Sequence, residues 1–94
     1  MGIKARDYGL IVPAPVKNLL IRRAEEAGIP YQIEVLVGGS TDGKVIQIAR
    51  SGVPTGGIAI PMRYTHTPSE TADRVDINAA VDLLVATLTQ EVDL

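Results

Sequence analysis

The sequence predicts an α/β fold, in which strands and helices alternate along one segment of 94 residues. Some stretches repeat apolar residues at every second position, and others repeat them at every third or fourth position. Prolines and glycines separate these stretches. Such alternation is typical of a sheet that is covered by helices. We expect a single α/β segment over residues 1–94, in the order β-α-β-α-β-loop-α.

The first two expected elements are a strand and a helix. Residues 3–8 alternate weakly, and Pro13 and Pro15 then break the strand, since proline does not fit inside a sheet. Pro15 suits the first turn of a helix, and Gly28 suits the position after its end. One face of this helix is apolar, formed by Val16, Leu19, Leu20, Ala24 and Ala27.

The next two elements are a strand over residues 31–37 and a second helix. In the strand, Tyr31, Ile33, Val35 and Val37 alternate with polar residues. The helix begins near Thr41 or Asp42, either of which can cap it, and ends at Ser51 before Gly52.

A short strand, a loop and a helix complete the chain. Residues 53–61, "VPTGGIAIP", are apolar and bounded by prolines, whereas residues 62–74 are polar and broken by proline. Asp76 is expected to cap the last helix. The buried face of that helix is predicted to contain Ile77, Ala80, Val81, Leu84 and Leu88.

Composition excludes several classes of function. The formal net charge is −2, and no basic patch with aromatic residues is present, which argues against nucleic acid or an anionic membrane as a partner. The chain has no cysteine, so disulfides, thiol nucleophiles and thiolate metal sites are excluded. No signal peptide opens the sequence, and no apolar run approaches the ~18 residues of a transmembrane helix. We expect a soluble, cytoplasmic protein.

The segment from Gly38 to Lys44 nearly matches a phosphate-binding loop, G-x-x-x-x-G-K-[ST]. Val45 replaces the hydroxyl residue that would bind Mg²⁺, and the carboxylate of Asp42 would repel a phosphate. A glycine-rich turn between strand and helix is the favoured interpretation. Nucleotide binding and a loop that lines another kind of site stay open.

His66 is the single histidine and lies in a predicted loop after a strand. On its own it is either a solvated side chain, a metal ligand or a general acid or base. Asp7, at the end of the first strand, suits an ion pair or a turn. Arg63 and Tyr64 precede the histidine and are candidates to contact an anionic or polar group of a substrate.

Several motifs resemble the M42 family of metallo-aminopeptidases. They are "GIPYQ" at 28–32, Gly38-Gly39, Thr41-Asp42, "SGVPTG" at 51–56 and "IPMRYTHTPSE" at 60–70. The family contains glutamyl and deblocking aminopeptidases that form tetrahedral particles, and some members have been labelled endoglucanases. Here Gly43-Lys44 replaces the small residue that usually follows Thr-Asp, which creates the likeness to a phosphate loop.

The resemblance implies the C-terminal part of a catalytic domain, a partial three-layer α/β/α sandwich with a mixed sheet. It implies that His66 binds one of two divalent metal ions, zinc or cobalt. The other ligands and the general base lie earlier in the family's chains, so this segment alone should be inactive. Implied partners are a peptide substrate, the rest of the catalytic domain and further copies in a dodecamer. The residues expected to line the substrate cleft are Gly38, Gly39, Thr41, Asp42, Arg63 and Tyr64.

Two other interpretations remain at this point. The chain also suits a non-catalytic, truncated paralogue that acts in assembly or regulation. Nucleotide binding through residues 38–44 is a weaker third.

Overall fold

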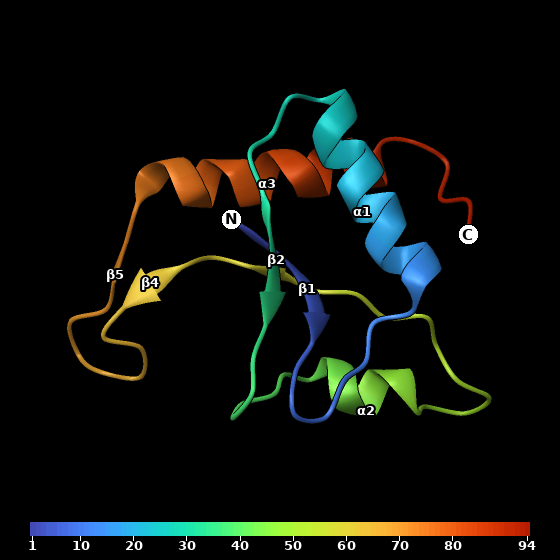
Figure 1. Ribbon diagram of the computed structural model, residues 1–94, viewed down its shortest axis with the longest axis horizontal. Coiled ribbons are helices and arrows are strands. Elements are labelled where there is room, and N and C mark those ends of the chain that lie inside the picture. Colours follow the sequence, from blue (N-terminus) through green and yellow to red (C-terminus); the bar gives the residue numbers. More distant parts are fainter.

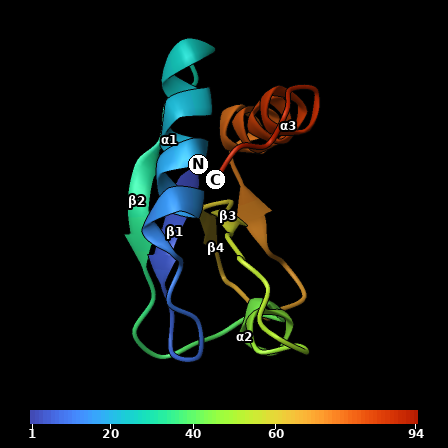
Figure 2. The same ribbon diagram turned by 90° about the vertical axis from the view of Figure 1, so that its right-hand side faces the viewer.

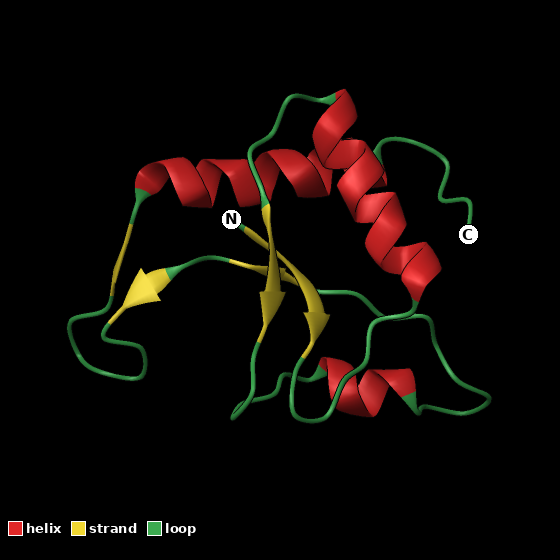
Figure 3. Ribbon diagram, viewed as in Figure 1, coloured by secondary structure: helices red, strands yellow, loops and turns green.

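A computed structural model describes all residues, 1–94, as a small α/β unit (Figure 1). Its three helices and five strands follow the order β-α-β-α-β-β-β-α (Figure 3). The bounds are β1 Gly2–Arg6, α1 Ala14–Glu26, β2 Gln32–Val35, α2 Gly43–Gln47, β3 Ile58–Ala59, β4 Met62–Arg63, β5 Thr71–Ala72 and α3 Arg74–Leu88. None of the three helices has the length and apolar character that crossing a membrane requires.

The main sheet has the strand order β2-β1-β3. β1 runs parallel to β2, with Ile3 opposite Ile33, and antiparallel to β3, with Ile3 opposite Ile58. The expected mixed sheet is therefore confirmed. β1 ends two residues earlier than the sequence pattern predicts, because Asp7 leaves the ladder and its carboxylate binds the amides of the following turn.

Helix α1 packs against β1 (Figure 2). It begins after Pro13, and it ends where Gly28 takes a φ of +67°. The amide of Gly28 donates to the carbonyl of Glu25, and the amide of Ile29 donates to that of Ala24. This pair of bonds satisfies the last carbonyls of the helix and confirms the predicted end at Gly28.

The hydrophobic core lies between β1, α1 and α3. Its central side chain is Ile3, which is fully buried against residues from both helices. The other core members are Met1, Leu20, Ala24, Ala79, Ala80 and Leu83. Full burial of a leucine or isoleucine stabilises a fold by roughly 1.5–3 kcal/mol, so this small cluster holds the two helices to the sheet.

The predicted cap and buried face of α3 are wrong. Asp73 caps the helix, because its Oδ1 accepts a 2.8 Å hydrogen bond from the amide of Val75, and Asp76 lies inside the first turn. Only Ala80 of the predicted face is buried; the residues that join it are Ala79, Leu83 and Thr87. The other four predicted members, Ile77, Val81, Leu84 and Leu88, are exposed. Since α3 is apolar on more than one side, periodicity alone did not select the face that meets the sheet.

The second helix is much shorter than predicted. It ends at Gln47, and residues 48–51 form turns in which Arg50 has a φ of +51°. No residue of α2 is buried, and the side chains of Val45 and Ile46 are exposed. Short helices gain most of their stability from tertiary packing, so little holds this one beyond five residues.

The stretch from residue 53 to residue 74 also differs from expectation. Only Ile58 and Ala59 of the predicted strand pair with β1. The predicted loop over residues 62–74 contains a small antiparallel hairpin, in which Met62 pairs with Ala72 and Arg63 pairs with Thr71. A two-residue ladder is too short to show in a sequence pattern that is dominated by polar residues and proline.

Candidate functional site

The β4–β5 hairpin carries the only histidine of the chain. It extends from the main sheet on the side away from α1 (Figure 1). All residues from Ile60 to Thr71 are exposed. The imidazole of His66, at the tip, is therefore open to solvent and to any group that covers this side.

The loop at the tip has an unusual but well-connected backbone. Tyr64 and His66 have φ values of +60° and +63°, in the left-handed region that residues with a Cβ rarely adopt. The amide of His66 donates to Oε2 of Glu70 at 3.0 Å. The hydroxyl and the amide of Thr67 both donate to the carbonyl of Tyr64. Residues in such backbone conformations cluster at functional sites. We therefore treat this loop as a candidate functional site.

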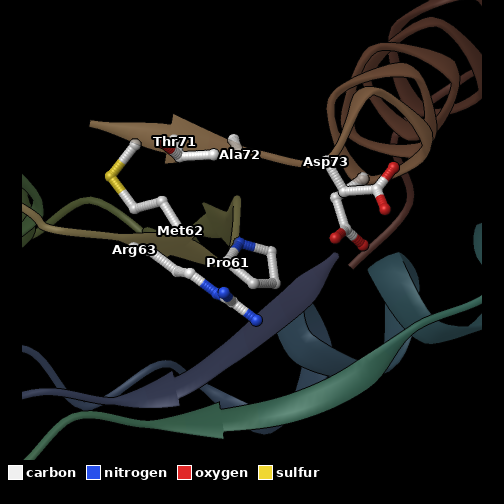
Figure 4. Close-up of a pocket in the computed structure, with 7 residues that line it drawn as sticks. Pro61, Met62, Arg63, Thr71, Ala72 and Asp73 are labelled. Carbon is white, nitrogen blue, oxygen red and sulfur yellow. The ribbon is translucent and has the colours of Figure 1, made fainter. Parts of the chain in front are cut away.

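A pocket of about 580 Å³ lies between the hairpin and the start of α3 (Figure 4). Arg63 borders it on the β4 side, and Asp73 and Asp76 border it on the α3 side. Asp73 already accepts a hydrogen bond from the Val75 amide. Arg63 has no carboxylate within 4.0 Å, so its guanidinium can bind an anionic group.

The glycine-rich turn after β2 is attached to the end of β1. The amide of Leu36 donates to the carbonyl of Arg6, and the amide of Tyr8 donates to that of Gly39. The amide of Gly43 donates to Oγ1 of Thr41 at 3.2 Å. The sequence offered Thr41 or Asp42 as the cap of α2. Asp42 makes no side-chain capping bond, whereas Thr41 accepts this bond from the first residue of the helix.

The geometry around Lys44 gives no support to nucleotide binding. A Cβ placed on Gly9 would lie 2.7 Å from Cδ of Lys44, which shows that the lysine stem packs closely over Gly9. The helix that follows the turn has only five residues. The segment is a glycine-rich turn between β2 and α2, as the favoured interpretation expected, and Lys44 packs against the loop after β1.

Some residues of the hairpin and of the end of β2 border the same pocket, but most of the predicted substrate-lining residues do not. Leu36 and Thr65 border one open pocket of about 560 Å³, with Glu34, Ala59 and Met62. Of the predicted substrate-lining residues, Arg63 borders the other pocket near α3. The remaining five, Gly38, Gly39, Thr41, Asp42 and Tyr64, line none of the three main pockets.

A buried charged cluster was not predicted as a unit. Nζ of Lys4 lies 3.2 Å from Oε1 of Glu34 and 3.5 Å from Oδ2 of Asp7. Lys4 and Asp7 are 4% and 1% exposed. Oδ1 of Asp7 also accepts from the amides of Gly9 and Leu10. The ion pair and the turn expected for Asp7 are both confirmed, but the contact with Glu34 depends on the register of β1 and β2, which the sequence pattern did not define.

The carboxylate of Asp7 is held in its ionised form. Desolvation by burial raises its pKa, but hydrogen bonds from Gly9, Ser40 and Leu10 and the charge of Lys4 outweigh this effect. The net result is a pKa below the usual value of an aspartate.

The residues of this chain do not form a complete metal centre. No three His, Cys, Asp or Glu side chains gather in a group that could hold a metal ion. His66 supplies a single imidazole, whereas a catalytic zinc ion requires about three protein ligands. The residues of this chain alone therefore do not provide the ligand set of a catalytic zinc site.

Comparison with known proteins shows which family this chain is similar to. Residues 1–83 match the M42 glutamyl aminopeptidase family. A predicted aminopeptidase of Acetivibrio thermocellus is 45% identical over 84 residues, which is 89% of this chain and 26% of that protein. The lysyl aminopeptidase of Pyrococcus furiosus is 36% identical over 98 residues, covering 87% of this chain and 28% of its own length.

A solved structure shows the same arrangement of elements. The TET aminopeptidase of Thaumarchaeota archaeon SCGC AB-539-E09, from marine sediment, superposes with a TM-score of 0.92 at 32% identity. The match covers 99% of this chain and 26% of that one. The chain thus spans about a quarter of the length of the proteins it matches. The resemblance seen in the sequence motifs is confirmed: the chain belongs to the M42 glutamyl aminopeptidase family.

Proposed function

We propose that this chain is the C-terminal part of the catalytic domain of a dinuclear metal-dependent aminopeptidase, which hydrolyses N-terminal residues from peptides. In this proposal His66 contributes one metal ligand. The other ligands and the general base come from parts of the complete protein outside these residues. The segment by itself is inactive, because one imidazole does not hold a catalytic metal ion.

The geometry of the β4–β5 hairpin carries this proposal. His66 lies at an exposed tip, and the backbone amide bond to Glu70 leaves its imidazole free. The left-handed conformations of Tyr64 and His66 cost roughly 1–2 kcal/mol each relative to ordinary backbone. A chain that keeps such a conformation around a single exposed histidine is best explained by a requirement for the position of that imidazole.

The proposed substrate is the N-terminal end of a peptide. The turn with Gly38, Gly39, Thr41 and Asp42 would border the cleft beside the peptide backbone. Arg63 and Tyr64 would contact polar or anionic groups of the substrate, and the absence of an ion pair at Arg63 supports this role.

The proposal extends to metals, partners and location. The two ions are zinc or cobalt, and the complete protein is a cytoplasmic homo-oligomer, a dodecamer. The rest of the catalytic domain would cover the open face of the sheet and complete a three-layer sandwich. The exposed side chains of Ile33 and Val35 on β2 and of Val81 and Leu84 on α3 support the need for such a cover.

The experiment uses the complete natural protein, the variant His66→Ala and the control Ser69→Ala. Ser69 lies in the same exposed loop, and its side chain makes no hydrogen bond. Release of N-terminal residues from peptides and the bound metal per subunit are measured for each. We expect wild type and Ser69→Ala to be active, and His66→Ala to lose activity together with metal. A wild-type protein without peptidase activity would instead favour the non-catalytic paralogue.

A further inference from the structure

The buried carboxylate of Asp7 connects two turns that are far apart in the sequence. Its Oδ1 accepts from the amides of Gly9 and Leu10, at 2.9 and 2.8 Å, and so closes the turn that follows β1. The same oxygen accepts a 2.9 Å hydrogen bond from the hydroxyl of Ser40, which follows β2. One atom thus ties the turn after β2 to the turn after β1.

The other oxygen of the Asp7 carboxylate faces a buried ammonium group. Oδ2 lies 3.5 Å from Nζ of Lys4, and that ammonium group lies 3.2 Å from Glu34 on the neighbouring strand. The side chains of Asp7 and Lys4 are 0% and 5% exposed. Oδ2 itself accepts no hydrogen bond, so the carboxylate is held by the three hydrogen bonds to Oδ1 and by the nearby charge of Lys4.

Few other contacts hold the turn in place. The amide of Tyr8 donates to the carbonyl of Gly39 at 2.9 Å, and Gly9 packs against Lys44. Gly38, Thr41 and Asp42 themselves are exposed and bury no apolar side chain. The position of this turn therefore depends on hydrogen bonds to the end of β1. Of these, only the bond from Ser40 to Asp7 involves a charged group.

We propose that Asp7 is a positioning residue, which acts through the hydroxyl of Ser40 to hold the Gly38–Asp42 turn in the conformation that receives the substrate. The inference rests on the proposed function, since it takes this turn as one wall of the peptidase cleft. Asp7 touches no substrate. Its effect is on the fraction of molecules in which the turn is ordered, and the apparent affinity for a peptide falls in proportion to that fraction.

The test compares Ser40→Ala, Ser40→Thr and Ser51→Ala in the complete natural protein. Ser40→Ala removes the hydroxyl and leaves the Lys4–Asp7 pair intact, whereas Ser40→Thr keeps a hydroxyl donor. Ser51 is an exposed serine beyond α2 that makes no side-chain hydrogen bond, and it serves as the control. KM and kcat for a peptide are measured, together with hydrogen exchange of the Tyr8 amide, which reports on the bond to Gly39.

We expect Ser40→Ala to raise KM by about threefold to tenfold with kcat little changed. In the same variant, hydrogen exchange of the Tyr8 backbone amide should be faster, on the order of tenfold. Ser40→Thr should restore both values, and Ser51→Ala should change neither. Faster exchange with an unchanged KM would overturn the role toward substrate, and unchanged exchange would overturn the anchoring itself. If the wild type does not cleave peptides, the proposed function fails, while the exchange measurement still decides whether Asp7 and Ser40 anchor the turn.

Discussion

The body of the molecule and its β4–β5 hairpin differ in what determines their structure. In the body, Ile3 and Leu83 are completely buried, β1 pairs in parallel with β2, and α1 packs against β1. In the hairpin, no residue from Ile60 to Thr71 is buried, and the backbone is held by a two-residue ladder and a few side-chain bonds. The candidate metal ligand lies in the hairpin, whereas the buried apolar side chains that stabilise the fold lie in the body.

This difference separates stability from function within one short chain. Substitutions in the hydrophobic core of the body should destabilise the fold without being specific for activity. Substitutions at the hairpin tip should affect the site while the fold is kept, because exposed side chains contribute little to stability. The predictions below test this separation, from the largest expected loss of stability to the smallest.

Leu83→Ala should have the largest effect. Leu83 is 0% exposed and contacts the core between α3 and β1, so the substitution leaves a cavity and should lower the free energy of unfolding by about 2–5 kcal/mol. Leu84→Ala, one residue further on the same helix, is the matched control, because Leu84 is 48% exposed. Urea unfolding of both variants measures the difference. Equal losses would show that α3 packs on another face.

Asp7 should make the stability of the body depend on pH. Its pKa in the folded state lies below that of the unfolded chain, so its contribution is complete above the unfolded value near pH 4 and is lost as the pH falls through the folded value. Asp7→Asn should be less stable than wild type at neutral pH, and the two should converge at acidic pH. Unfolding midpoints measured between neutral and strongly acidic pH provide the test. Parallel curves for the two proteins would contradict it.

Asp73→Ala should have a smaller effect. The substitution removes the hydrogen bond from the Val75 amide at the start of α3, and loss of such a cap typically costs about 1 kcal/mol. Asp82→Ala, at an exposed position in the middle of the same helix, changes the same charge without removing a cap. Chemical unfolding should distinguish the two variants. A larger loss for Asp82→Ala would argue against the observed start of α3.

The body was largely predictable from the sequence. Pro15 and Gly28 indicated the bounds of α1, and the alternation of Ile33 and Val35 indicated β2. These signals are local, because prolines, glycines and apolar periodicity act on the backbone within a few residues of their own position. The mixed sheet followed from the resemblance to the family, and the pairing of β1 with β2 and β3 confirms it.

The features that the sequence pattern missed depend on contacts between distant residues. The side of α3 that meets the core is decided by the position of Ile3 and Leu20, because α3 carries apolar residues on several sides. The link between Asp7 and Ser40 depends on the pairing of β1 with β2. The site itself is predictable only in part for the same reason: His66 stands out as the single histidine, but its other proposed metal ligands lie outside the chain.

The most direct test of the account measures stability and metal binding in one variant. His66→Ala in the complete natural protein should change the free energy of unfolding of the metal-free form by less than about 0.5 kcal/mol, since the side chain is exposed and makes no hydrogen bond. The same variant should lose bound metal and peptidase activity, while Ser69→Ala keeps both. If His66→Ala retains the metal content and the activity of the wild type, the hairpin is not part of the metal site, and the central claim is wrong.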